Sequence, residues 1–182
     1  PETLLSVRDL RGGFDTPDGR VKAIDGLNFD IARGELFAVV GESGSGKSVT
    51  AMAIMGLLPT LEIDSGEILW KGEDLLLMDE ERRRAIRGGE IAMIFQDPLS
   101  ALNPVHTVGR QIGEMARIHE GVSRKVALAR AIEMLDLVGI PEPAKRADMY
   151  PHEFSGGMRQ RAMIAMAITC KPALLIADEP TT

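Results

Sequence analysis

The sequence has little that would tie the chain to an oxidising compartment, a membrane interior or a nucleic acid. Its 182 residues include one cysteine, Cys170, so no disulfide can form within the chain. No apolar run approaches the roughly 18 residues of a membrane span, because the longest candidate, residues 51–58, contains Gly56. The 21 basic and 27 acidic residues give a net charge of −6, which argues against a broad basic surface for nucleic acid.

The remaining composition is that of a folded globular domain. Hydrophobic residues make up 45% and charged residues 26% of the chain, unlike a disordered segment. The N-terminal stretch PETLLSVRDLRGG carries charges and lacks a long apolar core, unlike a signal peptide. A chain of this length is about the size of one domain and can bury a core of its own.

The first half of the chain predicts strands around a glycine-rich loop. Alternation predicts a strand over residues 4–10, and residues 21–31, after a DTPDGR turn, suggest another strand pair. The continuous apolar run at 36–40 is typical of a parallel strand covered on both faces. After the loop, a helix is expected from Lys47 until Pro59 stops it. Two further strands are expected, over 65–75 and 91–95.

From about residue 99 to residue 147 the pattern becomes helical. Two helices are expected with these apolar faces: Val108, Ile112 and Met115 in the first, and Leu128, Ala131, Leu135 and Val138 in the second. Ser123 is the expected N-cap of the second helix, which Gly139 and Pro141 end. An apolar helix ending near Thr169 and a third buried strand at 173–177 follow. The order predicts an α/β core interrupted by a helical insert.

Residues 41–48, GESGSGKS, match the pattern GxxxxGK[ST] between a predicted strand and a predicted helix. Backbone N–H groups of such a loop converge on phosphate oxygens, and the following helix adds its positive N-terminal dipole. Lys47 is expected to reach the β- and γ-phosphates, and the Ser48 hydroxyl to bind Mg²⁺. A chance glycine-rich turn is the alternative, which the strand–loop–helix context disfavours. The candidate nucleotide-contacting residues of this segment are Gly41, Glu42, Ser43, Gly44, Ser45, Gly46, Lys47, Ser48 and Val49.

Two carboxylates, Asp178 and Glu179, follow the last predicted strand. They would lie at the carboxyl edge of the sheet, where ligands bind in open α/β folds. Asp178 is expected to support Mg²⁺ through water, and Glu179 to polarise the attacking water as a general base. An acidic pair after an apolar strand is by itself usually a strand end in solvent. Together with the phosphate loop, the pair predicts nucleotide hydrolysis.

The segment Ser155-Gly156-Gly157 opens the last predicted helix, with Ser155 as its N-cap. Its two glycines would expose backbone N–H groups and create a second anion site. One chain has no obvious use for two phosphate sites around one nucleotide. A symmetric dimer does, if each chain covers the γ-phosphate that its partner holds. The alternative is an ordinary capped helix after a loop.

The order of the segments GESGSGKS, IFQDP, FSGGMRQR and LLIADEP resembles the ATP-binding subunits of ABC transporters over the whole chain. The longer strings IFQDPLSALNP and YPHEFSGGMRQRAMIAMAITCKPALLIADEPTT look like the oligopeptide/dipeptide (and nickel) importer branch, where FSGGM is usual in place of LSGGQ. The resemblance implies an α/β fold, a P-loop NTPase (RecA-like) core with an N-terminal antiparallel β subdomain and an inserted α-helical subdomain.

The resemblance also implies boundaries within a single, incomplete ATPase domain over residues 1–182. Residues 1–98 would form the β subdomain and nucleotide core, 99–154 the helical subdomain, and 155–182 the signature helix and Walker B strand. The C-terminal part of the core, with the D-loop and the switch histidine, would lie beyond these residues. We therefore expect the fragment to bind Mg-ATP and to hydrolyse it poorly.

Further residue roles follow from the same resemblance. Gln96 would be the Q-loop glutamine, which contacts Mg²⁺ and the attacking water and senses the membrane subunits. Gln96, Lys47 and Glu179 are the implied catalytic residues, and Ser48, Gln96 and Asp178 the implied metal contacts. Phe14 occupies the A-loop position, where an aromatic ring stacks on adenine. Ser155, Gly156 and Gly157 would act in trans on the partner's ATP.

The resemblance implies a subunit that hydrolyses ATP to drive import of di- and oligopeptides, bound peripherally at the cytoplasmic face of the membrane. Its expected partners are a second ATP-binding subunit in a head-to-tail homo- or heterodimer, transmembrane permease subunits and, indirectly, a periplasmic or extracellular peptide-binding protein. No nucleic-acid partner is expected. A soluble ABC ATPase of DNA repair or translation is one alternative, although the sequence shows neither a coiled-coil insertion nor tandem cassettes. A nucleotide-binding module without turnover is another.

Overall fold

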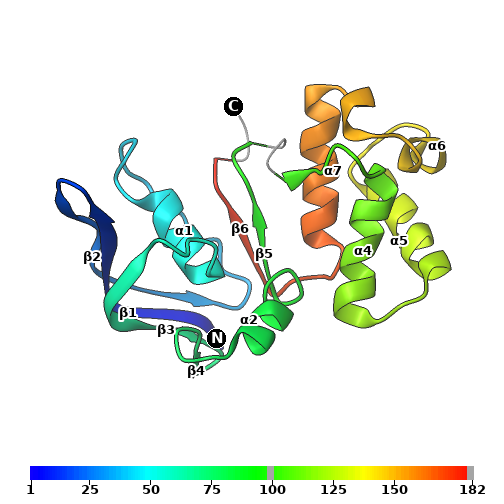
Figure 1. The fold of residues 1–182 in the computed structure, drawn as a ribbon. Coiled ribbons are helices and arrows are strands. Elements are labelled where there is room, and N and C mark those ends of the chain that lie inside the picture. Colours follow the sequence, from blue (N-terminus) through cyan, green and yellow to red (C-terminus); the bar gives the residue numbers. More distant parts are fainter. Residues whose placement is uncertain (98–100, 180–182) are drawn as a thin grey trace. The chain divides into compact units, whose positions relative to one another are not determined.

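A computed structural model describes residues 1–97 and 101–179 of the chain. The fold divides into two compact units, Pro1–Arg84 and Ala85–Thr182 (Figure 1). The first unit contains an antiparallel sheet and the glycine-rich loop, and the second contains two parallel strands and the helical region. The subdomain boundaries expected at 98/99 and 154/155 stay a prediction.

The sheet of the first unit is antiparallel, as expected for the N-terminal subdomain. Its strands are β1 (Thr3–Thr16), β2 (Gly19–Ala32), β3 (Glu62–Trp70) and β4 (Glu73–Asp74), in the order β2-β1-β3-β4. The β1–β2 hairpin turns at Pro17 and Asp18, and Gly19 follows in the left-handed region at φ 119°. Residues 4–10 lie in β1, which confirms the strand predicted there. Their burial does not alternate strictly, because Leu4 and Leu5 are both buried and the register with β2 shifts between Val7 and Leu10.

Residues 36–40 do not form the predicted buried strand. They enter no strand ladder, and the side chains of Leu36 and Val40 are 98% and 90% exposed. A parallel strand needs hydrogen-bonding neighbours, whereas the described sheet of this unit is antiparallel and does not include the segment. Phe37 instead stacks on Phe29 of β2, with ring centroids 5.0 Å apart. The prediction of a strand here is therefore wrong for this structure.

Helix α1 (Lys47–Met55) follows the glycine-rich loop, as predicted, but ends earlier than expected. Gly56 adopts the left-handed conformation at φ 65°, and its N–H donates to the carbonyl of Ala53. A glycine in this conformation terminates a helix, so α1 ends before Pro59 is reached. The short helix α2 (Glu80–Ile86) follows the sheet and buries Ile86.

In the second unit, β5 (Ile91–Ile94) and β6 (Leu174–Ala177) pair in parallel, with Ile94 opposite Ala177. All four residues of β5 are buried, which confirms that predicted strand. The expectation that β6 is buried as fully is wrong, because its residues alternate between half-buried and exposed and Leu175 is 42% exposed. The parallel pairing places the carboxyl ends of both strands at one edge.

The helical region comprises α4 (Val108–Glu120), α5 (Arg124–Leu137), α6 (Pro143–Ala147), the 3-10 helix η1 (Pro151–Glu153) and α7 (Gly156–Ile168). Ser123 caps α5 as predicted, because its side chain accepts from the N–H of Val126. The predicted apolar face of α5 is wrong at Leu128, which is 44% exposed, because Ala127 occupies the buried side of that turn. No helix in the described ranges is long and apolar enough to cross a membrane.

Helix α7 joins the helical region to the parallel strands. On one side, Ala162 and Ala165 belong to the core cluster that contains Val108 and Ile112 of α4. Elsewhere on α7, Met163 and Ala167 pack with buried residues of β5. Because one helix serves both clusters, its N-terminus is fixed relative to β5 and β6 within this unit.

Candidate functional site

The loop of residues 41–48 folds tightly before α1. Gly44 and Gly46 have φ values of 80° and 94°, in the left-handed region that favours glycine. A Cβ added at Gly46 would lie 2.7 Å from the carbonyl oxygen of Ala23, and one added at Gly41 would lie 2.6 Å from the Ser45 hydroxyl oxygen. Side chains at these two positions would therefore open the loop or push it away from β2.

The Lys47 side chain folds back over this loop. Its ammonium Nζ donates to the carbonyl oxygens of Gly41 and Glu42, at 2.6 and 2.8 Å, and to the Ser45 hydroxyl at 3.3 Å. Gly46 is the N-cap of α1 and has no side chain that could accept a hydrogen bond from the first turn. The N–H groups at the positive end of the helix therefore face the loop uncapped. A cation, an uncapped helix start and an exposed glycine-rich backbone together favour binding of a phosphate.

Phe14 lies on the strand that pairs with β2, the strand that this loop approaches. It lies half-buried on β1, opposite Val21 of β2. Two residues further along β2, the Ala23 carbonyl contacts the loop at Gly46. Residues 21–23 of β2 therefore lie between the ladder partner of Phe14 and the phosphate loop. Phe14 and the loop both belong to the first unit.

Gln96, Asp178 and Glu179 meet at the carboxyl ends of β5 and β6. The amide Nε2 of Gln96 donates to Oε2 of Glu179 at 3.0 Å, and the Asp178 N–H donates to the Ile94 carbonyl at 3.0 Å. Glu179 is held at φ 44°, a left-handed conformation that few non-glycine residues adopt. Carboxylate and amide oxygens are the ligands that Mg²⁺ prefers, and a carboxylate can also accept a proton from water.

Ser155, Gly156 and Gly157 form an exposed start of α7. The Ser155 hydroxyl accepts from the N–H of Met158 at 3.2 Å, so Ser155 is the N-cap as predicted. A Cβ added at Gly156 or Gly157 would meet no atom within 4 Å. Packing against residues 1–97 and 101–179 therefore does not require glycine at either position. The glycines leave the backbone of the first turn accessible from outside.

The structure groups the predicted site residues in two sets. The loop, with Lys47, Ser48 and Val49, and Phe14 belong to the first unit, whereas Gln96, the acidic pair and the SGG segment belong to the second. Sequence reasoning placed Ser45 in the nucleotide-contacting segment but did not foresee that its hydroxyl accepts from Lys47. It also missed Arg20, whose ion pairs depend on strands distant in sequence.

Known proteins match the chain along its whole length. It is 56% identical over 183 residues to a probable peptide ABC transporter ATP-binding protein of Sinorhizobium fredii, matching all of this chain and 55% of that protein. A dipeptide transport ATP-binding protein of Bacillus subtilis is 54% identical, with the same shares matched. An oligopeptide transport ATP-binding protein of the same species is 55% identical, with 98% of this chain and 51% of that protein matched. The chain thus spans about half the length of these relatives.

Solved ABC cassettes share the fold. A dimeric structure of MJ0796, a bacterial ABC transporter cassette, has a TM-score of 0.86 and 26% identity, with 98% of this chain and 75% of that chain matched. A dimeric post-hydrolysis structure of the same cassette, bound to ADP and Pi, has a TM-score of 0.87 at 26% identity, with the same shares matched. The family model of the ABC transporter matches residues 24–182, which include the phosphate loop, Gln96, the SGG segment and the acidic pair. On these motifs and this match, the chain belongs to the ABC transporter family.

Proposed function

We propose that the chain is the nucleotide-binding part of a subunit that hydrolyses ATP to drive import of di- or oligopeptides. The contact between Gln96 and Glu179 carries the hydrolytic part of the proposal, because it holds a carboxylate beside an amide at a sheet edge. The peptide substrate rests on the names of the relatives in Sinorhizobium and Bacillus, which are peptide transport proteins.

The residues of the loop fit a nucleoside triphosphate. The Lys47 ammonium contacts three neutral oxygens of its own loop, and phosphate oxygens are stronger acceptors because they carry charge. Lys47 would exchange these contacts for the β- and γ-phosphates, with Gly41 to Gly46 supplying backbone N–H groups. The ring of Phe14 would stack on the adenine, and Val49 would lie in the first turn of α1 behind the phosphates.

Ser48, Gln96 and Asp178 are the residues proposed to hold Mg²⁺, directly or through water. Each offers an oxygen, which is the donor type that Mg²⁺ requires. When bound, Mg²⁺ neutralises charge on the β- and γ-phosphate oxygens during transfer.

Glu179 is proposed as the general base. Its Oε2 accepts the hydrogen bond from Gln96, which orients the carboxylate. The second carboxylate oxygen can then accept a proton from a water molecule positioned for attack on the γ-phosphate. Gln96 thereby has two proposed roles, as a metal contact and as the group that orients the base.

The proposed partners follow from exposed surfaces. The SGG segment would cover the ATP of a second ATP-binding subunit, which fits the open space at Gly156 and Gly157. Permease subunits would dock on the helical subdomain, where Ile118, Val126 and Leu128 expose apolar side chains. The complex would place the subunit at the cytoplasmic face of the membrane, with a periplasmic peptide-binding protein delivering the substrate.

Replacement of Glu179 by Gln in the full-length protein tests the hydrolytic role. We expect Glu179→Gln to bind Mg-ATP with the affinity of the wild type, while the hydrolysis rate falls by roughly 100- to 10,000-fold, the contribution of a general base. Phosphate release and a fluorescent ATP analogue measure the two quantities. Glu67→Gln, an exposed position on β3, is the matched control and should leave both unchanged. Normal turnover in Glu179→Gln would remove Glu179 from this role.

The transport role needs a separate experiment. We expect the full-length protein to co-purify with integral membrane proteins, and its ATP hydrolysis in vesicles to increase when a peptide-loaded binding protein is supplied. Co-purification with ribosomes or DNA would instead favour a soluble ABC ATPase. Binding of ATP with no turnover in any preparation would favour a module that binds without hydrolysing.

A further inference from the structure

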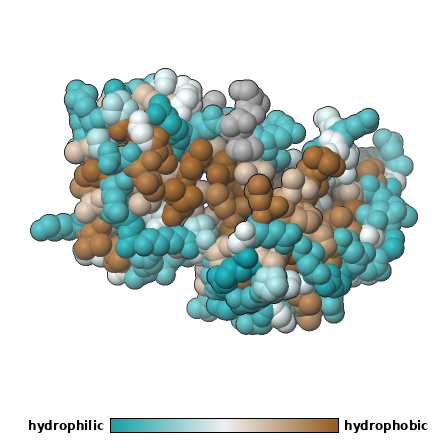
Figure 2. Space-filling model, turned by 180° about the vertical axis from the view of Figure 1, so that it is seen from behind, coloured by the Kyte–Doolittle hydropathy of each residue, from teal (hydrophilic) through white to brown (hydrophobic). Residues whose placement is uncertain are grey.

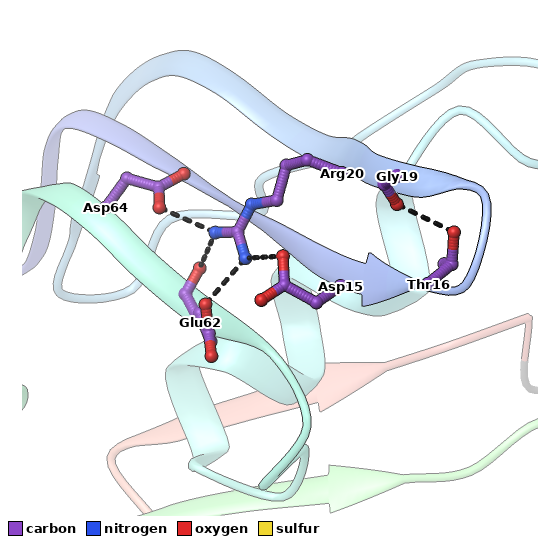
Figure 3. Close-up of polar contacts among 6 residues, drawn as sticks. All are labelled: Asp15, Thr16, Gly19, Arg20, Glu62 and Asp64. Atoms are coloured by element: carbon purple, nitrogen blue, oxygen red, sulfur yellow. Dashed lines mark hydrogen bonds and ion pairs between the residues drawn. The ribbon is translucent and has the colours of Figure 1, made fainter.

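The guanidinium of Arg20 joins three strands at one end of the antiparallel sheet. Its Nη1 contacts the carboxylates of Asp15 on β1 and Glu62 on β3, at 2.9 and 2.6 Å, and its Nη2 contacts that of Asp64 on β3 at 2.6 Å (Figure 3). The Arg20 side chain is only 29% exposed, although it lies near a hairpin turn. The hydrogen bond that Arg20 donates to the Asp15 carboxylate is the main cause that raises the pKa of Arg20, so the group stays charged.

The network begins one ladder pair away from Phe14. In the ladder between β1 and β2, Phe14 is opposite Val21, and the next pair towards the turn is Asp15 with Arg20. The ion pair between Arg20 and Asp15 therefore closes the hairpin one residue from the candidate base-stacking ring.

On the side of Phe14 away from the hairpin turn, the neighbouring residues of β1 provide little side-chain packing. Gly12 and Gly13 have no side chains, and the register between β1 and β2 shifts between them. The pairing of β1 with β3 ends at Gly13 and Glu62, so Phe14 has no ladder partner on β3. Arg20 supplies the missing connection, because it reaches across β1 to the carboxylates of Glu62 and Asp64.

We propose that Arg20 is a positioning residue that fixes the end of β1 that carries the Phe14 ring, and so sets the affinity for the nucleobase without touching the nucleotide. The proposal rests on the proposed function, because it assumes that the loop binds a nucleoside triphosphate. The mechanical path is short: Arg20 and Val21 are adjacent on β2, and Ala23 of the same strand contacts Gly46 in the loop. Without Arg20, three neighbouring carboxylates would repel one another and spread the strand ends.

The test compares ligands with and without a base, in the full-length protein. Dissociation constants for ATP and for inorganic tripolyphosphate, both with Mg²⁺, are measured by calorimetry for wild type, Arg20→Ala and Arg20→Lys. We expect Arg20→Ala to weaken ATP binding about 5- to 10-fold, the lower part of what base stacking contributes, with unchanged tripolyphosphate binding. Lys offers one compact charge in place of the guanidinium fork, so Arg20→Lys should fall between the two. Unchanged tripolyphosphate affinity also shows that the loop remains folded.

Two further variants make the proposal falsifiable. Arg8→Ala is the matched control, because Arg8 forms an exposed ion pair with Asp30 across the same two strands, away from Phe14. It should leave both affinities unchanged. In a Phe14→Ala background, Arg20→Ala should cause no further loss of ATP affinity, since Arg20 acts through the ring.

Each other result contradicts the proposal. An equal loss of ATP and tripolyphosphate affinity would mean that Arg20 acts on the loop or through its charge. Additive losses in the double variant would mean that Arg20 acts independently of Phe14. A Phe14→Ala protein with normal ATP affinity would overturn the positioning role and leave the proposed function intact. A wild-type protein that binds neither ligand would overturn both.

Discussion

Among single residues, Lys47 is expected to contribute more to nucleotide binding than Phe14. Its ammonium group can bond several phosphate oxygens, and a hydrogen bond to a charged group contributes about 1.5–3 kcal/mol. Stacking of one aromatic ring on a base contributes about 1–3 kcal/mol in total. The difference lies in the number of charged contacts that each side chain can form.

The prediction from this ranking is that Lys47→Ala nearly abolishes ATP binding, while Phe14→Ala weakens it. Calorimetric titration of the two full-length variants with Mg-ATP measures the difference. Tripolyphosphate is the control ligand, because Phe14→Ala should bind it normally and Lys47→Ala should not. Equal ATP affinities of the two variants would contradict the ranking.

The residues that the sequence alone identified have their chemistry encoded locally. Lys47 follows directly from the GxxxxGK[ST] pattern, and Ser123 and Ser155 precede helices that they cap. Arg20 could not be found in this way, since its carboxylate partners on β3 lie 42 and 44 positions along the chain. Which carboxylates it meets depends on the register of three strands, and the register is a property of the folded sheet.

At the scale of secondary-structure elements, α5 and α7 begin in the same way. Ser123 and Ser155 each accept a hydrogen bond from the N–H three residues later, at 3.3 and 3.2 Å. Replacement of either serine by alanine should therefore destabilise the protein by about 1 kcal/mol. Only the helix start at Ser155 carries two glycines with open space around them.

The prediction is that Ser155→Ala and Ser123→Ala lower the unfolding midpoint by similar amounts, whereas only Ser155→Ala lowers ATP hydrolysis. Thermal unfolding and phosphate release in the full-length protein measure the two effects. Ser123→Ala serves as the control for loss of a cap. A similar fall in hydrolysis in both variants would mean that Ser155 acts only through helix stability.

Elements with a local signal were predictable where, for a strand, a partner strand is also in place, as β6 is for β5. The apolar run without a partner strand was not. The buried strand at 91–94 and the caps of α5 and α7 have local signals in their residues. The apolar run at 36–40 has the composition of a buried parallel strand, but it needs partners to supply hydrogen bonds. In the structure Phe37 finds Phe29, while Leu36 and Val40 stay exposed. Composition alone does not report whether a partner strand is in place.

At the scale of the whole molecule, the space around the start of α7 bears on assembly. Hydrophobic and hydrophilic residues both lie on the face shown in Figure 2, so hydropathy by itself does not identify an interface there. The glycines of the SGG segment give a sharper criterion, because no atom of the described residues lies within 4 Å of a Cβ added to them. A glycine that packing within its own chain does not require indicates that a partner approaches the backbone at that position.

The corresponding prediction concerns the oligomeric state. Full-length Glu179→Gln should form a dimer with Mg-ATP, as measured by light scattering, and Gly156→Ala added to it should prevent dimer formation. The added methyl group meets no atom of its own chain, so the unfolding midpoint should not fall. That midpoint is the internal control. A dimer that persists with Gly156→Ala would show that the SGG segment does not cover the partner's nucleotide.

The three hydrogen bonds of the Lys47 ammonium have a consequence for the rate of ligand capture. They connect the end of the loop to its beginning, which restricts the conformations that its backbone can adopt. A preorganised site loses little conformational entropy on binding. The incoming triphosphate exchanges one set of acceptors for another instead of folding a loose segment. Association should therefore be limited by diffusion and by charge, not by a slow closing of the loop.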